Sequence, residues 1–319
     1  MQSARHRLSD PNDLSLNDFA QQLRRGGFID RLLNLARDED MGVPARDLTG
    51  ELMFAPSDTR EVLLRARQDG IAAGLAFMPD LIAVFSAEND IEHEIMLRDG
   101  DAVRAGVTMA RLKGNAREIV AMERTMLNLL SRMCGIATLT SAYVDLVAGT
   151  SAKICDTRKT TPGLRVLEKY AVRCGGGTTH RMGLHDAVLI KDNHIAGLSE
   201  KELATKLPDL TYTMTGSDAP IWFVQVEVDS LDQLRAVLSA ESGMGDIVLL
   251  DNMTPEMLRE AVAIRDESGV RVLLEASGGV NQRTVRAIAE TGVERISVGS
   301  LTHQAQSIDL GLDSVSAGA

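Results

Sequence analysis

The sequence predicts an α/β protein, in which a region of mixed helices and short strands precedes a parallel β-sheet with helices packed outside it. After residue 150, short apolar runs alternate with segments of helical periodicity. Before it, short extended segments are separated by turns such as Asp69-Gly70 and Asp99-Gly100. A third observation is size, because 319 residues of which 44% are hydrophobic can bury a large core and predict two domains.

The first half of the chain predicts helices around short strands. Residues 1–15 are polar, and we expect them to be disordered. A helical period over Leu16–Asp38 predicts one helix, and Ile119–Leu146 predicts one or two, with Gly135 as the point of a break. Methionines at helical spacing in the second segment are expected to pack in the core. Strands are predicted at Val62–Ala66, Gly70–Leu75, Glu94–Leu97, Val103–Val107 and Met109–Lys113.

The second half predicts six strands and four helices in alternation. Asp229-Ser230 and Asp251-Asn252 offer N-caps, and Pro255 is placed where a first helical turn tolerates proline. The strands are expected at Ala152–Cys155, Ala187–Ile190, Phe223–Val228, Ile247–Leu250, Val270–Glu275 and Arg295–Val298. The helices are expected at Gly163–Arg173, Leu231–Ala240, Thr254–Glu267 and Gln282–Thr291.

The composition excludes several classes of protein. A formal net charge of -11 argues against nucleic acid as a partner, and an aromatic content of 3% argues against a base-stacking surface. Cys134, Cys155 and Cys174 have no metal-type spacing and suit buried thiols in a reducing compartment. The N-terminus lacks the apolar core of a signal peptide, and no apolar run is long enough to cross a membrane. We therefore expect a cytoplasmic protein without a membrane partner.

Charged residues follow the predicted strands at the points where the strands end. In α/β barrels this rim forms the active site, and here it would carry Asp156, Arg158, Lys159, Lys191, Glu227, Asp251, Glu275 and Gly299. A purely structural role would place apolar or turn residues there. Cations are also concentrated in one part of this acidic chain: Arg158, Lys159, Arg165, Lys169, Arg173, His180, Arg181 and Lys191. Such a concentration attracts phosphates and carboxylates, so we expect an anionic small-molecule substrate.

Two glycine turns in consecutive β/α units predict a phosphate site. Ser277-Gly278-Gly279 lies between a predicted strand and a predicted helix, and Val298-Gly299-Ser300 closes the next strand. Glycine turns expose backbone N–H groups, and the N-terminus of a following helix adds partial positive charge, so a phosphate fits. Barrel enzymes often bind phosphate at their last strands.

Eight motifs, spread in order over about residues 38–312, point to a family. They are E-R-T-M-L-N-L-L, D-T-R-K-T-T-P-G-L-R, K-Y-A-V-R-C-G-G-G-T-T-H-R, L-I-K-D-N-H-I, V-E-V-D-S, L-L-D-N, E-A-S-G-G-V and V-G-S-L-T-H. Together they resemble quinolinate phosphoribosyltransferase, also called nicotinate-nucleotide pyrophosphorylase (carboxylating). Ser300 and Thr161 differ from residues common in that family, but neither difference removes a charge that the chemistry needs.

The resemblance implies a fold and a reaction. The fold is an N-terminal α/β sandwich followed by an incomplete (open) α/β barrel, and we place the sandwich at residues 16–125 and the barrel at 126–319. A final helix is expected to pack back on the first domain. The family belongs to the pentosyltransferases among the glycosyltransferases. It converts quinolinate and phosphoribosyl pyrophosphate to nicotinate mononucleotide, carbon dioxide and pyrophosphate, with Mg²⁺, in de novo NAD biosynthesis.

The resemblance also implies roles for the matching residues. Quinolinate would be bound by Arg124, Arg158, His180, Arg181 and Lys191. In a homodimer or a dimer-based oligomer, Arg124 would reach the neighbouring subunit's site. Phosphoribosyl pyrophosphate would be bound by Lys159, Glu227, Asp251, Ser277, Gly278, Gly279, Gly299, Ser300 and His303. The catalytic residues would be Lys159, Lys191, Glu227 and Asp251. Of these, Glu227 and Asp251 would hold magnesium, directly or through water.

Three other functions are alternatives. A transferase-like relative associated with molybdenum transport would lack the cluster of cations, which is present here. A Schiff-base aldolase would use Lys191 as its nucleophile, with a pKa lowered by the neighbouring cations, and borohydride trapping would detect it. A binding or scaffold protein would show no turnover.

Overall fold

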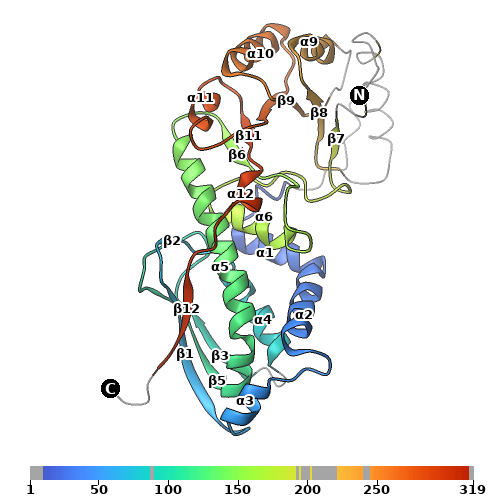
Figure 1. Ribbon diagram of the computed structural model, residues 1–319. Coiled ribbons are helices and arrows are strands. Elements are labelled where there is room, and N and C mark those ends of the chain that lie inside the picture. The colour runs from blue at the N-terminus through green and yellow to red at the C-terminus, as the bar shows by residue number, and fades with distance from the viewer. Residues whose placement is uncertain are drawn as a thin grey trace. The chain divides into compact units, whose positions relative to one another are not determined.

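The structure, a computed structural model, describes residues 10–86, 90–191, 194, 202, 221–239 and 245–315 (Figure 1). Backbone contacts divide the chain into two units. The barrel unit consists of the residues up to Asp13, Ala142–Lys159 and Gly177–Ser300, and the sandwich unit consists of Leu14–Ser141, Thr160–Gly176 and the residues from Leu301 on. This division differs from the predicted boundary between residues 125 and 126, because α5 (Ala116–Leu146) is one continuous helix that runs across it.

The sandwich unit is built on a four-stranded antiparallel sheet. Its strands stand in the order β12 (Leu310–Ser314), β1 (Thr59–Ala66), β5 (Thr108–Asn115) and β3 (Glu92–Ile95). A separate pair joins β2 (Gly70–Ile71) to β4 (Ala102–Val103). The final element was predicted as a helix and is the strand β12, which pairs with β1. Its leucines, Leu310 and Leu312, alternate with Gly311 and Asp313 at the period of a strand.

The helices of the sandwich unit also differ from the prediction. The single helix expected over Leu16–Asp38 is two helices, α1 (Leu16–Arg25) and α2 (Phe28–Met41), because Gly27 between them adopts a φ of 64°. Three short elements were not predicted: α3 (Leu48–Met53), a 3₁₀ turn (Leu75–Phe77) and α4 (Met78–Phe85). Helix α6 (Arg165–Cys174) of this unit is present, as expected.

Helix α5 lies along the four-stranded sheet and carries much of the core (Figure 1). Its methionines Met122, Met126 and Met133 are buried, which confirms their predicted role in packing. Gly135 does not break the helix. A Cβ atom at this position would overlap the carbonyl oxygen of Gln306, so the glycine lets another segment of the backbone approach α5 closely.

The barrel unit is a six-stranded parallel sheet, and all six strands were predicted. Their order in the sheet is β6 (Lys153–Cys155), β11 (Arg295–Ser297), β10 (Leu273–Ser277), β9 (Ile247–Asp251), β8 (Val224–Val228) and β7 (Val188–Ile190). Of the strands in this sheet, the first along the chain, β6, thus lies beside the last, β11. Among the described residues no strand pairing joins β6 to β7, so the sheet is open between these two strands, as expected of an incomplete barrel, and the predicted fold class is confirmed. Thr178 forms a single parallel bridge with Cys155 on the open side of β6.

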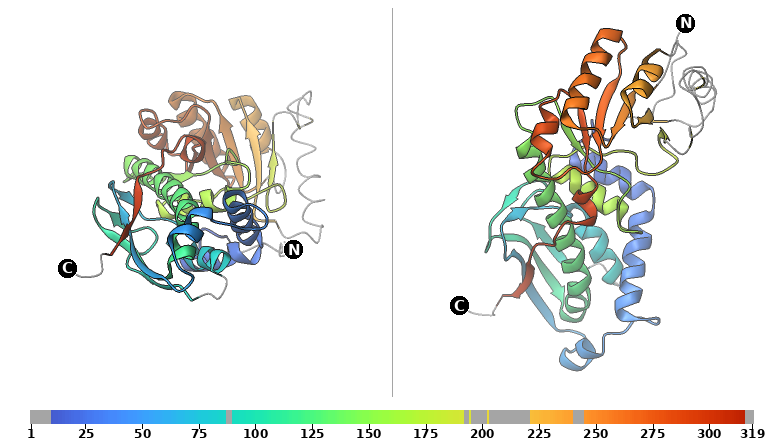
Figure 2. Two further views of the ribbon diagram at one scale, coloured as in Figure 1. Left: turned by 60° about the horizontal axis from the view of Figure 1, so that its bottom comes forward. Right: turned by 45° about the horizontal axis from the view of Figure 1, so that its top comes forward.

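Helices cover the outer face of this sheet (Figure 2). They are α9 (Leu231–Ser239), α10 (Pro255–Ser268) and α11 (Val285–Ala289), and α12 (Ser300–His303) follows β11. Ser230 accepts a hydrogen bond from the N–H of Gln233, as expected of an N-cap. The cap of α10 is Thr254 and not Asp251-Asn252, because the helix begins only at Pro255.

The N-terminal segment requires a correction. Residues 1–9 lie outside the described residues, but residues 10–15 are not frayed. Pro11 is buried, and Asn12 exchanges two hydrogen bonds of 3.0 and 2.7 Å with the backbone of Thr179. The side chain of Ser15 caps α1. In the part of the chain that the structure describes, no helix is long and apolar enough to span a membrane.

Candidate active site

The parallel ladder brings polar side chains from neighbouring strands to one face of the sheet. Paired residues of parallel strands point to the same face, and successive residues alternate. Glu227 and Glu275 both pair with Leu249, Ser277 pairs with Asp251, and Ser297 pairs with Cys155. This inner face therefore carries Cys155, Gln225, Glu227, Asp251, Glu275, Ser277, Arg295 and Ser297. The opposite face carries buried apolar residues, among them Ile154, Val226, Leu250, Leu274 and Ile296.

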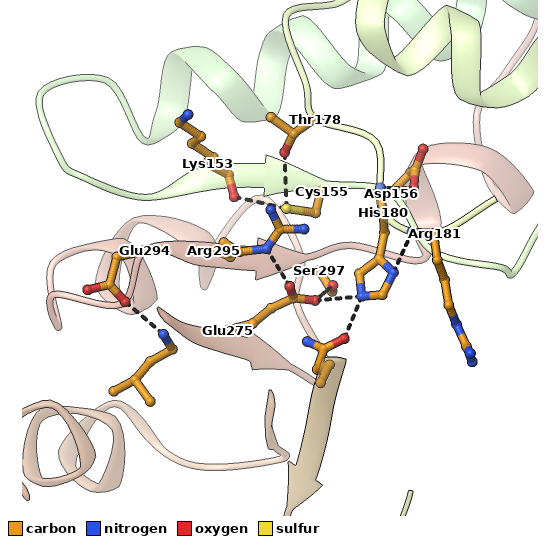
Figure 3. Close-up of polar contacts among 12 residues, drawn as sticks. Lys153, Cys155, Asp156, Thr178, His180, Arg181, Glu275, Glu294, Arg295 and Ser297 are labelled. Atoms are coloured by element: carbon orange, nitrogen blue, oxygen red, sulfur yellow. Dashed lines mark hydrogen bonds and ion pairs between the residues drawn. The ribbon is translucent and has the colours of Figure 1, made fainter. Parts of the chain in front are cut away.

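A buried polar cluster on the inner face surrounds Glu275, which pairs with the same residue, Leu249, as Glu227 but is fully buried (Figure 3). Arg295 Nε lies 2.6 Å from Glu275 Oε2, and the hydroxyl of Ser297 donates to Oε1. Burial alone would raise the pKa of Glu275, but the charge of Arg295 and the hydrogen bonds outweigh it and lower that pKa to about 2. The cluster thus contains an ionised carboxylate and its paired guanidinium.

His180 connects this cluster to the loops above it. Its Nε2 lies 2.7 Å from Gln225 Oε1 and 3.4 Å from Glu275 Oε1, and its Nδ1 accepts a 2.8 Å hydrogen bond from the N–H of Arg181. The backbone N–H of His180 donates to Asp156, the buried residue that follows β6. Both ring nitrogens therefore contact protein atoms, and the ring fixes the backbone that carries Arg181.

Arg181 extends away from Glu275 (Figure 3), and charges of both signs affect its guanidinium group. Burial lowers the pKa of its guanidinium, and the nearby charge of Arg158 lowers it further, against the opposing effect of Asp186 and Glu227. Two guanidinium groups from different segments are thus close enough to repel each other. An anion between them would relieve this repulsion, and the anion-binding role of this pair stays a prediction.

Lys191 and Glu227 form an ion pair at the next strand ends. Lys191 follows β7, Glu227 lies near the end of β8, and Nζ is 3.8 Å from Oε2. The backbone N–H of Lys191 donates to His194 Nδ1. The rim therefore combines cations on one side with the carboxylates of Glu227 and Asp251, which ends β9.

The glycine turn after β10 is present, but its helix is not where it was expected. Gly278 and Gly279 have φ values of 94° and 60°, which favour glycine. The helix predicted over Gln282–Thr291 is only α11, which begins at Val285. A helix end does not follow this turn directly, so an anion there would depend on the N–H groups of the turn itself. In the next turn, Ser300 Oγ lies 3.3 Å from the hydroxyl of Tyr143.

Not all of the predicted residues lie in the barrel unit. Arg124, exposed on α5, and His303, at the end of α12, belong to the sandwich unit. Three of the eight clustered cations, Arg165, Lys169 and Arg173, lie on α6 in the same unit. Lys169 is fully buried, and Arg173 donates to the carbonyl of Leu14, so these residues take part in the fold. Arg158 and Lys159 are exposed in the loop after β6.

Sequence reasoning missed the polar residues around Glu275. Gln225, Arg295 and Ser297 were not proposed, although each stands two positions from another polar residue in an otherwise apolar strand. The pairs 225/227, 275/277 and 295/297 repeat at the period of a strand, and this was the signal available.

Comparisons with known proteins identify the family of the chain. The family models for the N-terminal and C-terminal domains of quinolinate phosphoribosyl transferase match residues 47–134 and 136–313. The chain is 43% identical to the nicotinate-nucleotide pyrophosphorylase [carboxylating] of Mycobacterium leprae over 77% of this chain and 84% of that protein. It is 37% identical to the probable nicotinate-nucleotide pyrophosphorylase [carboxylating] of Bacillus subtilis, over 89% and 93%.

A solved structure supports the same conclusion for the fold. The nicotinate-nucleotide pyrophosphorylase from Francisella tularensis superimposes with a TM-score of 0.79 at 34% identity, covering 96% of this chain and 99% of that chain. The matches of both domains and of the whole fold agree with the eight sequence motifs. The chain belongs to the quinolinate phosphoribosyltransferase family.

Proposed function

We propose that the rim of the open barrel is the active site in which this chain transfers a phosphoribosyl group to quinolinate. As a member of its family the chain is a decarboxylating phosphoribosyltransferase of NAD biosynthesis. It forms nicotinate mononucleotide, pyrophosphate and carbon dioxide from quinolinate and phosphoribosyl pyrophosphate. The observation that carries the assignment of the site is that Arg181 lies close enough to Arg158 and Glu227 for their charges to affect it, while Asp251 ends the strand beside that of Glu227.

The basic side of the rim suits quinolinate. Quinolinate is a pyridine with two adjacent carboxylates, and planar guanidinium groups bind carboxylates through paired hydrogen bonds. Arg158 and Arg181 would bind these groups, and Lys191 would add a further charge. His180 would act mainly by holding Arg181, because its Nδ1 accepts the N–H of that residue.

The acidic side suits the ribose. When the bond from C1 of the ribose to pyrophosphate breaks, the electron pair leaves with pyrophosphate, and positive charge develops on the sugar. The carboxylates of Glu227 and Asp251 would stabilise this charge. Lys159 would bind the departing pyrophosphate, and the turns at Ser277–Gly279 and Gly299–Ser300 would bind the 5-phosphate. The ring nitrogen of quinolinate forms the new bond to C1.

Decarboxylation then follows from the charge of the ring. The ribosylated nitrogen is cationic, so the ring accepts the electron pair of the bond to the neighbouring carboxylate. Carbon dioxide leaves, and a proton takes its place on the ring carbon. No covalent bond to the protein is needed, and the ion pair of Lys191 with Glu227 supports a binding role rather than a Schiff base.

The residues fit a magnesium ion that arrives with its substrate. Among the described residues, no group of three or more His, Cys, Asp or Glu side chains could hold a metal. Mg²⁺ in phosphate chemistry is commonly held by one or two carboxylates, water and the substrate's phosphates. Glu227 and Asp251 offer two such carboxylates. A bound Mg²⁺ would neutralise charge on the pyrophosphate group.

The reaction itself tests the proposal. Purified protein with quinolinate, phosphoribosyl pyrophosphate and Mg²⁺ should form nicotinate mononucleotide. Nicotinate lacks one of the two carboxylates. The kcat/KM for nicotinate should therefore be lower than that for quinolinate by about 10²-fold or more, because a cation on the basic side of the rim would have no carboxylate to bind. Arg181→Lys should reduce the preference for quinolinate, whereas Arg259→Lys, on the exposed surface of α10, should not. Equal turnover of nicotinate and quinolinate by the unaltered enzyme would contradict the assignment of the basic side.

We also propose that the enzyme acts in the cytoplasm as a homodimer in which Arg124 completes the neighbouring subunit's pocket. The three buried free thiols suit a reducing compartment. Arg124 is exposed on α5, as a residue that reaches another subunit must be.

Arg124→Ala and Lys191→Ala should each be inactive. Mixed and allowed to exchange subunits, they should regain activity in hybrid dimers that contain one intact site. If subunits exchange and activity does not return, Arg124 acts in the site of its own subunit or only stabilises the fold.

A further inference from the structure

Asn252, directly after β9, has an unusual backbone conformation. Its φ is 54°, and among the residues that the structure describes it is the one non-glycine residue with a positive φ. Glycine adopts this conformation without penalty, whereas a side chain makes it unfavourable, less so for asparagine than for most residues. A side chain kept in such a conformation beside a candidate active site is a reason to ask what it does there.

The side chain of Asn252 contacts the residue before it. Its Nδ2 donates a 2.6 Å hydrogen bond to Oδ2 of Asp251, the carboxylate that ends β9. Asn252 does not cap the following helix, because Thr254 does so. The left-handed conformation instead turns the asparagine amide toward the carboxylate of its neighbour.

Asn252 also contacts the glycine turn after β10. Its backbone N–H donates to the carbonyl of Ser277 at 2.9 Å. Its side chain lies against Gly278, where a Cβ atom would come within 2.6 Å of Asn252 Cγ. Asp251 and Ser277 are already paired in the parallel ladder. Asn252 therefore keeps the segments that follow β9 and β10 in contact beyond the end of the paired strands.

These contacts join the two elements that the proposed function assigns to phosphoribosyl pyrophosphate. Asp251 is the carboxylate near the ribose, and Ser277–Gly279 is the turn for the phosphate. A residue that fixes both would set the orientation of one relative to the other. Asn252 is not itself assigned to any substrate.

We propose that Asn252 is a positioning residue, which holds the Asp251 carboxylate and the Ser277–Gly279 turn in the arrangement that binds phosphoribosyl pyrophosphate. This inference rests on the proposed function of Asp251 and of the turn. It assigns to Asn252 an effect on one substrate, phosphoribosyl pyrophosphate, and none on the binding of quinolinate at the basic side of the rim.

The decisive variant is Asn252→Gly. Glycine tolerates the positive φ, so the variant removes the amide while the backbone conformation stays favourable, and its Tm should equal or exceed that of the unaltered enzyme. The kcat/KM for phosphoribosyl pyrophosphate should fall by about 10- to 100-fold, the usual effect of removing a group that orients a ligand. The KM for quinolinate should change by less than about threefold. Asn252→Asp, which faces a second carboxylate toward Asp251, should lose more activity than Asn252→Gly.

A double variant shows whether Asn252 acts through Asp251. Asp251→Asn should impair turnover strongly on its own, and adding Asn252→Gly should then lower the rate by less than about threefold, because residues that act as a unit are not additive. Wild-type kinetics of Asn252→Gly alongside an impaired Asp251→Asn would overturn the inference and leave the proposed function intact. Equal loss for both substrates together with a lower Tm would also overturn it, because Asn252 would then only support the fold. Wild-type kinetics of Asp251→Asn would remove the assignment of Asp251, and the inference with it.

Discussion

Replacing Glu275 by glutamine should test whether the charged cluster that Glu275 forms with Arg295 stabilises the fold. The pKa of Glu275 is about 2, against an ordinary value of 4.5, and one pKa unit corresponds to about 1.4 kcal/mol. The ionised side chain therefore contributes about 3 kcal/mol to the free energy of unfolding at pH 7. Glu275→Gln loses this contribution and leaves the guanidinium of Arg295 buried without its partner, so a destabilisation of about 3–5 kcal/mol is expected.

The pH dependence gives the sign of the effect. Because the pKa is lower in the folded protein, the stabilisation is fully present above pH 4.5 and is lost as the pH falls toward 2. At pH 3, less than half of it remains, about 1 kcal/mol. Urea unfolding followed by circular dichroism, at pH 7 and at pH 3, should therefore show a difference between Glu275→Gln and wild type that shrinks by about 2 kcal/mol at the lower pH.

Two comparison variants make this measurement specific. Glu260→Gln removes a carboxylate that pairs with Arg235 on the exposed surface, and it should cost less than about 1 kcal/mol at either pH. Glu275→Gln combined with Arg295→Met removes both charges and should be more stable than Glu275→Gln alone. A destabilisation by Glu275→Gln below about 1 kcal/mol, or one that is the same at both pH values, would refute the charge-based account.

Two further predictions concern the sandwich unit and the cysteines. Gly135→Ala should destabilise the protein by more than about 2 kcal/mol in urea unfolding, because its Cβ meets the carbonyl of Gln306; Gly26→Ala, with an ordinary contact of 3.4 Å, is the control. Burial raises the pKa of Cys134 to about 12 and of Cys155 to about 11, so the native thiols should resist Ellman's reagent at pH 8 and react in urea. Fast reaction of either thiol in the folded protein would contradict its burial.

The barrel strands could be predicted because their signals are local. Each is a short apolar run buried on its outer face, and polar residues such as Glu227 and Asp251 follow at the strand ends. The charges also indicated an anionic substrate, but the run of cations was overinterpreted. Lys169 and Arg173 are close to Arg158 in the sequence, and yet they belong to α6 and not to the loop that carries Arg158. Closeness in sequence did not show that the chain leads these side chains to different places.

The remaining errors share one cause, which is that a distant partner decides the local structure. Gly135 suggested a helix break. In the structure this position is a glycine because the backbone of Gln306 approaches α5 too closely for a Cβ atom. The residues of β12 are few and were read as a helix, since the strand β1 that pairs with them lies far away in sequence. Asn252 suggested a helix cap, but its partners Asp251 and Gly278 place it in another role.

The pairing of β1 with β12 also has a consequence for how the chain is made. Ribosomes add about 5–20 residues per second, and Ala66 pairs with Leu310, so the growing chain holds β1 for some tens of seconds before its partner exists. During that time one side of β1 is an open edge, on which strands from other molecules can assemble. Nascent chains stalled between these two strands should therefore bind a chaperone that recognises extended apolar segments, and release it once Leu310–Ser314 has left the ribosome.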